Sequence, residues 1–160
     1  IWATYSYAKV ERDDGDQIYP TNFDRRHNAN LLVSYELGKN RDWEASARWN
    51  LGSGFPFTLT QGFYGDYAFN DGVNTDVTTE NPDLGIIYDE EINAGRLPYY
   101  HRLDFTLKRS FVFGGNKSLD VTASVTNAYD RNNIFFFDRV EFERVDQLPI
   151  IPSLGLVFKF

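Results

Sequence analysis

The alternation of apolar and polar residues along several segments is the feature that most constrains the fold of this 160-residue chain. In the segment 42–51 every second residue is apolar, the set being Trp43, Ala45, Ala47, Trp49 and Leu51. The alternation recurs, less completely, in the segments 1–10, 26–37, 102–111, 119–126 and 150–160. Because successive side chains of a β-strand point to opposite faces, this pattern predicts six strands, each with one apolar and one polar face.

The connections between these segments differ in length in a regular way. Two of them, 38–41 and 114–117, are short and have the composition of tight hairpin turns. Three are long, at about 11–25, 61–97 and 131–149. In an antiparallel up-and-down order, all the long connections would lie at one end of the sheet. This asymmetry, with strands near the 9 to 11 residues that cross a bilayer, predicts a segment of a transmembrane β-barrel.

A soluble β-sandwich that acts as a binding module also shows alternation and is the alternative fold. Aromatic residues favour the barrel, because they gather at both ends of the predicted apolar faces, as at two lipid–water interfaces. Those near the short turns are Tyr35, Trp43, Phe111, Phe113 and Phe160. Those near the long connections are Trp49, Phe55, Phe57, Tyr99 and Tyr129.

Six strands are too few to close a barrel, because the smallest bacterial barrels have about eight. An open sheet in lipid leaves two edges of unpaired backbone groups, and each unpaired group is costly in free energy. The sequence also begins at Ile1, without an initiator methionine or a signal segment. We therefore expect the chain to be the C-terminal part of a longer polypeptide, or to be completed by other chains.

Acidic residues are concentrated in the longest connection. Between Gln61 and Leu97, Arg96 is the one basic residue, and the acidic residues are Asp66, Asp71, Asp76, Glu80, Asp83, Asp89, Glu90 and Glu91. The formal charge of this segment equals that of the whole chain, −7. We expect a solvated extracellular loop. Its candidate roles are binding cations, repelling anionic solutes and docking a surface lipoprotein.

The composition excludes several classes of protein. An isoelectric point near 4.8 and the lack of a basic stripe argue against a nucleic-acid partner. The absence of cysteine excludes disulfides and thiolate zinc sites. The longest apolar run, from Ile134 to Phe137, is far shorter than the roughly 20 residues of a membrane helix, which excludes a helical membrane protein.

The sequence predicts neither an enzyme nor a metal or cofactor site. A serine hydrolase needs serine beside histidine. The serines of the predicted strands lie on the polar face, whereas His27 and His101 lie on the apolar face. A place at the lipid interface accounts for both histidines without a metal. The acidic runs 13–16 and 70–76 offer oxygen ligands for calcium but lack the EF-hand order, so a solvated loop is the preferred interpretation.

Four motifs occupy the ends of the predicted strands: 19–27 (YPTNFDRRH), 52–58 (GSGFPFT), 97–104 (LPYYHRLD) and 127–135 (NAYDRNNIF). As an ordered set, followed by a terminal phenylalanine, they resemble the C-terminal barrel strands of TonB-dependent outer-membrane receptors of Bacteroidetes type. The resemblance covers essentially the whole chain. It implies the last six of about 22 strands, in the bacterial outer membrane.

In that family a plug domain fills the barrel and carries the segment that engages TonB. The resemblance implies import of a solute such as a siderophore, glycan, peptide or cobalamin, with the plug and the TonB-engaging segment absent from this sequence. It also implies lipid, the remaining strands, the plug and the barrel-assembly machinery as partners. Leu156, Phe158 and Phe160 resemble the signal that this machinery reads. The alternative function is a non-transporting scaffold subunit of an outer-membrane assembly or secretion complex.

Charged residues on the polar face of the predicted strands are candidates for the wall that faces the barrel lumen. The main ones are Arg48, Arg102, Asp104 and Lys108, and Asp120 and Lys159 lie on the same face. In a receptor they would contact plug or solute, whereas the simpler interpretation is a wall of paired and solvated charges. Arg109 lies on the apolar face near a short turn, and we expect its side chain to reach the lipid headgroups.

Overall fold

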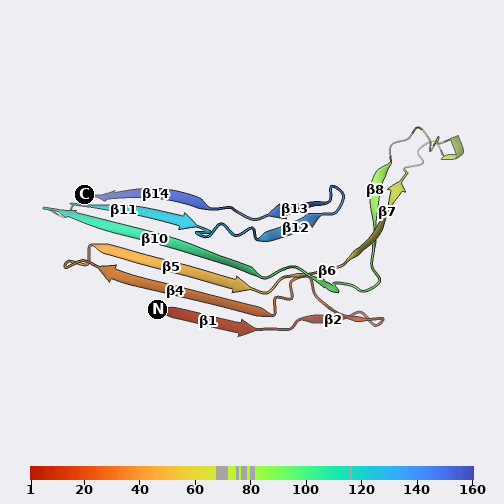
Figure 1. Cartoon of the computed structure of the whole chain (residues 1–160), viewed down its shortest axis with the longest axis horizontal. Coiled ribbons are helices and arrows are strands. Elements are labelled where there is room, and N and C mark those ends of the chain that lie inside the picture. Colours follow the sequence, from red (N-terminus) through yellow and green to blue (C-terminus); the bar gives the residue numbers. More distant parts are fainter. Residues whose placement is uncertain (68–71, 75, 77–78, 80–81, 116) are drawn as a thin grey trace.

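The structure is a computed structural model that describes residues 1–67, 72–74, 76, 79, 82–115 and 117–160. Its main element is a six-stranded antiparallel sheet, whose strand order in space is the order along the chain (Figure 1). The strands are β1 (Trp2–Tyr7), β4 (His27–Leu37), β5 (Trp43–Gly52), β10 (Tyr100–Phe113), β11 (Lys117–Thr126) and β14 (Ile151–Lys159). The prediction of an all-β antiparallel meander is therefore confirmed.

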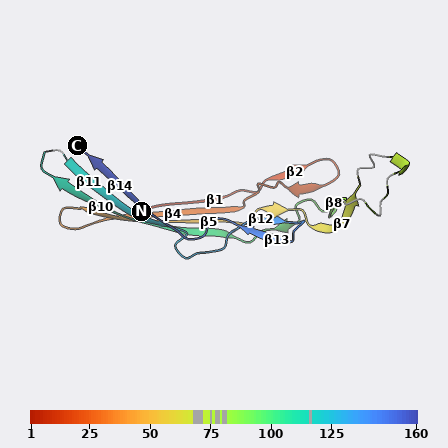
Figure 2. The same ribbon diagram turned by 90° about the horizontal axis from the view of Figure 1, so that it is seen from above.

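The sheet is open. Among the described residues, β1 pairs with β4 alone and β14 pairs with β11 alone, so each of these outer strands has a free edge. Seen from above in Figure 2, the sheet is a single layer in which β11 and β14 turn away from the direction of β4 and β5. The described chain thus forms a twisted sheet and not a closed barrel.

The short and long connections lie at opposite ends of the sheet, as predicted (Figure 1). In the turn between β4 and β5, the amide of Arg41 donates to the carbonyl of Gly38 at 3.2 Å, and both residues have a positive φ. The turn between β10 and β11 contains Gly115 with φ 82°. Both predicted tight hairpins are confirmed by the pairing of their flanking strands.

The long connections hold further strands, so the predicted count of six was too low. They form four two-stranded sheets, which the alternation did not indicate. The pairs are β2 (Glu11–Asp13) with β3 (Ile18–Pro20), β6 (Pro56–Phe57) with β9 (Gly95–Arg96), β7 (Thr60–Asp66) with β8 (Asp83–Tyr88), and β12 (Ile134–Asp138) with β13 (Glu143–Asp146). A short 3-10 helix, η1, covers Gly72–Asn74.

The strand register gives the sheet two chemically different faces. One row of laterally paired residues on the apolar face is Tyr35, Ala45, Leu107, Ala123 and Leu154. The next row, on the polar face, is Ser34, Ser46, Thr106, Ser124 and Ser153, which places five hydroxyl groups across five strands. The alternation seen in the sequence thus becomes an apolar surface on one side and a polar surface on the other.

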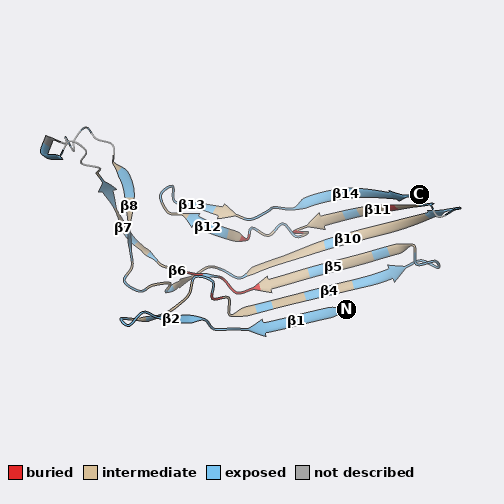
Figure 3. Cartoon of the chain, turned by 180° about the vertical axis from the view of Figure 1, so that it is seen from behind, coloured by how far each residue is buried: buried red, intermediate tan, exposed pale blue. Residues whose placement is uncertain are grey.

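Neither face is covered by a second sheet in the part of the chain that the structure describes. No Leu, Ile, Val, Phe, Tyr or Trp among the described residues is buried. Figure 3 shows mainly exposed residues in β1 and β14 and intermediate burial in β5 and β10. A β-sandwich needs a second sheet packed on the first, and the described residues do not form one. No helix in the described residues is long and apolar enough to span a membrane.

Candidate functional site

Buried polar side chains mark the junction where the six-stranded sheet meets the long connections. Asp24, Ser53, Asn127 and Asn133 lie at this end, whereas Asp120 lies near the other end. Asp24 and Asn127 have no exposed surface at all. Since buried polar groups are costly unless they are hydrogen-bonded, each of them must hold specific partners.

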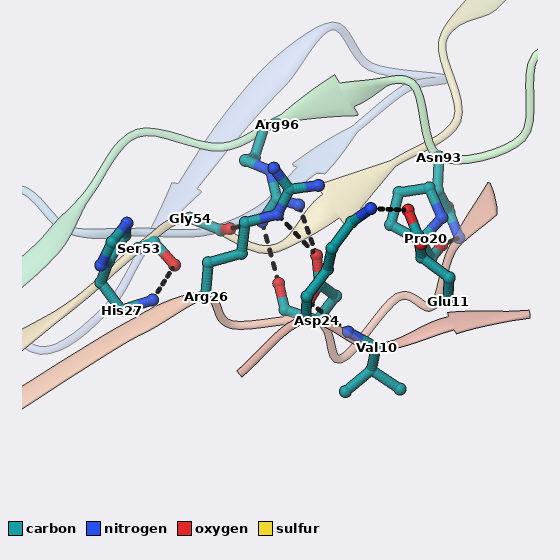
Figure 4. A network of polar contacts seen from close by, with 11 residues as sticks. Val10, Glu11, Pro20, Asp24, Arg26, His27, Ser53, Gly54, Asn93 and Arg96 are labelled. Atoms are coloured by element: carbon teal, nitrogen blue, oxygen red, sulfur yellow. Dashed lines mark hydrogen bonds and ion pairs between the residues drawn. The ribbon is translucent and has the colours of Figure 1, made fainter. Parts of the chain in front are cut away.

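Asp24 joins three segments of the chain (Figure 4). Its carboxylate accepts hydrogen bonds from Nη2 of Arg96 at 2.6 Å, the amide of Val10 at 2.9 Å and Nε of Arg26 at 3.3 Å. Arg96 also donates through Nη1 to the carbonyl of Asp24 at 2.9 Å and to that of Gly54 at 3.1 Å. This cluster holds the connection after β1, the strand β9 and the end of β5 in one arrangement.

Burial alone would raise the pKa of the Asp24 carboxyl. Hydrogen bonds from Arg96, the amide of Val10 and Arg26 outweigh that effect, so the pKa lies below its usual value. A carboxylate with a lowered pKa in the folded state stabilises the fold above its unfolded pKa of about 3.9. That contribution is lost as the pH falls through the folded pKa.

A pH series should therefore show acid destabilisation that depends on Asp24. Between pH 7 and 5 we expect the free energy of unfolding of the wild type to exceed that of Asp24→Asn by a constant amount. Below about pH 4 the difference should shrink, because the carboxyl of the unfolded wild-type chain becomes protonated while that of the folded chain is still ionised. Urea unfolding of the full-length protein in micelles at each pH measures this, and a difference that does not shrink at all between about pH 5 and pH 3 would contradict the assignment.

Ser53 and Gly54 complete the junction beside Asp24 (Figure 4). The hydroxyl of Ser53 accepts from the amide of His27 at 3.1 Å, and the amide of Ser53 donates to the carbonyl of His27 at 2.8 Å. A Cβ at Gly54 would lie only 1.6 Å from the carbonyl oxygen of Leu97. Glycine is therefore required here for the close approach of two backbone segments.

The change Gly54→Ala should separate the segment that follows β5 from the segment that precedes β10. We expect a loss of about 2 kcal/mol or more in the free energy of unfolding, because backbone must move to admit the methyl group. Gly114→Ala is the matched control, since nothing lies within 4 Å of a Cβ built there. Equal unfolding midpoints in urea for the two variants would contradict this role.

Asn127 and Asn133 form a second buried cluster at the ends of β10 and β11. The Asn127 side chain donates to the carbonyls of Arg131 at 3.0 Å and Leu148 at 3.1 Å, and accepts from the amide of Arg131 at 3.1 Å. Its amide donates to Asp104 at 3.1 Å, and its φ is 54°. The Asn133 side chain pairs with the backbone of His101, accepting at 3.2 Å and donating at 3.0 Å.

The two clusters bring together all four motifs that carry the family resemblance. Residues of 19–27, 52–58 and 97–104 meet around Asp24, Ser53 and Gly54, and residues of 97–104 and 127–135 meet around the two asparagines. Their chemistry is structural, because each polar group is used to fix a connection. These residues were not predicted to form a site, although the polar motifs at the strand ends were a usable signal.

A groove lined by aromatic residues lies beyond this junction, between the long connections. One cavity of about 450 Å³ is lined by Asn22, Phe55, Pro56, Phe57, Leu97, Phe135, Phe136, Phe137 and Arg139. A second, of about 320 Å³, is lined by residues of β7, β12 and β13 and shares Phe137 and Arg139. Nη1 of Arg139 donates to Thr60 at 3.0 Å, and its guanidinium lies 5.0 Å from the ring of Tyr88. Arg139 thus holds two long connections together.

The predicted lumen-facing candidates share one face of the sheet. Arg48 is paired in register with Asp104, and Arg102 donates to Asp104 at 2.8 Å. Lys108 lies 3.4 Å from Asp120, which also accepts from Ser110 at 2.7 Å and lies 3.6 Å from Lys159. Arg102 and Asp104 form one ion pair, and Asp120 pairs with Lys108 and Lys159, whereas Nε of Arg48 donates to the Asn50 side chain at 3.3 Å. Whether these residues face a lumen stays a prediction.

The histidines contact tyrosines at the same end of the sheet. Nδ1 of His27 is 2.8 Å from the hydroxyl of Tyr5, and Nδ1 of His101 is 2.6 Å from that of Tyr129. No group of three or more His, Cys, Asp or Glu side chains suited to a metal ion occurs within the described residues. The carboxylates of Asp13 and Asp14 instead accept backbone amides of their own turn, at 2.9 to 3.1 Å.

The acidic connection is described only in part. Asp71 and Glu80 lie outside the described residues. Asp66 and Asp83 are paired in register at the outer end of the β7–β8 hairpin, and Asp89 accepts from the amide of Glu91 at 3.0 Å. At the other end of the chain, Leu156 and Phe158 of the predicted assembly signal are paired with Val121 and Leu119 of β11.

In comparisons with known proteins, no family model, no curated protein and no solved structure matches this chain.

Proposed function

We propose that this chain forms part of the wall of an outer-membrane β-barrel, that of a TonB-dependent receptor which imports a solute. The observation that carries the proposal is the single-layer sheet with an uncovered apolar face and no buried large apolar side chain in its described part. In water such a sheet has little hydrophobic stabilisation, because no large apolar side chain of the described residues is fully removed from solvent. In a bilayer the same face is solvated by lipid.

Strand length and sheet edges support the same placement. Strands β4, β5, β10 and β11 have 11, 10, 14 and 10 residues, which suits a tilted crossing of the hydrocarbon core. The free edges of β1 and β14 would need further strands as neighbours, because lipid cannot satisfy backbone N–H and C=O groups. In the proposed receptor, the remaining barrel strands supply these neighbours.

The long connections support the receptor over the scaffold subunit. In outer-membrane barrels the longer loops are extracellular, and here that end carries the aromatic groove around Phe57, Phe137 and Arg139. Apolar and aromatic walls with a few polar groups are typical of binding sites for small solutes. A plug domain and TonB would supply the coupling, and a surface lipoprotein is a candidate lid over the acidic connection.

Site-directed spin labelling tests the membrane placement. Phe105→Cys and Thr106→Cys are adjacent on β10 but belong to opposite faces, and the chain has no native cysteine. In bilayers we expect the label at position 105 to collide mainly with dissolved oxygen and the label at 106 mainly with a water-soluble nickel complex. A label at 105 that is shielded from both reagents would indicate a packed protein core and would contradict the proposal.

Uptake measurements separate the receptor from the scaffold subunit. Deleting the gene should abolish TonB-dependent uptake of at least one siderophore, glycan or peptide, and the wild-type gene should restore it. Copurification with stable partners, together with unchanged uptake of every solute tested, would favour the scaffold subunit instead.

A further inference from the structure

Arg109 places a positive charge within the apolar face, near the end with the short turns. The register aligns it with Trp43 on β5 and with Val121 on β11. Their neighbours in the same row are Leu37 and Leu156. A guanidinium set into such a row is costly unless a partner reaches it, so its surroundings require an explanation.

Aromatic rings hold the guanidinium on two sides. Its central carbon lies 4.4 Å from the ring of Phe111 and 4.8 Å from the ring of Trp43. Nε lies 3.9 Å from a carboxylate oxygen of Asp42, which is beyond hydrogen-bond distance. Neither terminal nitrogen donates a hydrogen bond to a described residue. The side chain is oriented by its two aromatic neighbours and by its ion pair with Asp42, and its terminal nitrogens remain as donors for a further anion.

An apolar groove continues from this cation along the face. Its volume is about 330 Å³, and its lining includes Leu107, Val121 and Ala123 together with Arg109 and its two aromatic neighbours. Leu107 is paired in register with Ala45 on one side and Ala123 on the other. The small side chain of Ala123, which lines the groove, leaves space beside Leu107 that a linear hydrocarbon chain can fill.

We propose that Arg109 and this groove bind an anionic glycerophospholipid, its phosphate on the guanidinium and an acyl chain along Leu107 and Ala123. This lipid site rests on the proposed membrane placement, in which the short turns face the periplasm and this end of the sheet meets the inner leaflet. Arginine pairs with phosphate through two parallel N–H donors, and aromatic side chains favour the headgroup level. Charge and shape therefore both select a lipid whose headgroup is an anion.

Native mass spectrometry of the full-length protein, released from bilayers of phosphatidylcholine with a minor fraction of phosphatidylglycerol, tests this site. We expect Arg109→Gln to weaken retention of phosphatidylglycerol about fivefold. Arg41→Gln is the matched control, because Arg41 lies at the same end, is largely exposed and lies 3.6 Å from Glu36. Its retention should stay within about twofold of the wild type. Equal losses in the two variants would overturn the site.

Two further experiments distinguish a bound lipid from a free anion as the ligand of this site. Ala123→Phe fills the groove, so it should weaken phosphatidylglycerol retention although the cation is intact. Inorganic phosphate in excess should not displace the lipid, and displacement would identify a plain anion site instead. The Phe105→Cys and Thr106→Cys labels report the membrane placement separately. A clear contrast between these labels with unchanged lipid retention in Arg109→Gln would reject the lipid site alone.

Discussion

Replacing Asp24 with alanine is expected to lower the free energy of unfolding by about 3 to 5 kcal/mol. The carboxylate is fully buried, and its removal would leave Arg96, which is only partly exposed, without its ionic partner. The same change would also deprive the amide of Val10 and Nε of Arg26 of their acceptor. Urea unfolding of the full-length protein in micelles, followed by tryptophan fluorescence, measures the loss.

Asp16→Ala is the control, because it removes a carboxylate from an exposed turn in the same connection and should change stability by less than about 0.5 kcal/mol. A double-mutant cycle with Arg96→Ala isolates the pair. If the two changes add without a coupling free energy, the contact between Asp24 and Arg96 does not hold the junction, and the role given to it here is wrong.

Most of the six-stranded sheet could be predicted from the sequence, because alternation and burial are linked directly in a strand with two different faces. Trp43 to Leu51 shows this best, since the complete alternation there became β5. The short strands of the connections could not be predicted. A pair such as β6 and β9 has two residues on each side, too few for any period to appear, and its members are separated by residues 58–94.

The junction could be predicted only in part, for a similar reason. Asp24 and Asn127 stood in motifs that suggested strand ends, but their hydrogen bonds reach partners 72 and 21 residues away. The sequence around Asp24 or Asn127 does not indicate which distant residue will be its hydrogen-bond partner. Asn127 gave one local signal, because asparagine at the end of a strand readily adopts a positive φ. The alternation predicts the face on which Arg109 lies, whereas its position between Trp43 and Phe111 needed the register of β5 against β10.

Placing an arginine at Ala47 should destabilise the protein in bilayers by about 2 to 4 kcal/mol. Ala47 lies in the middle of β5 on the apolar face, paired in register with Val33 and Phe105. In the proposed placement the new charge would face the hydrocarbon core, too far from either surface for its side chain to reach water easily. Reversible unfolding in urea from short-chain phosphatidylcholine bilayers measures the cost.

Ser46→Arg introduces the same side chain one residue away, on the polar face between Ser34 and Thr106. There the charge meets hydroxyl groups and water, so we expect a change of less than about 1 kcal/mol. The difference between the two variants cancels the effects of arginine on strand propensity and on the unfolded state. Equal costs at both positions would mean that the two faces have the same surroundings, which is incompatible with a sheet that has lipid on one side and water on the other.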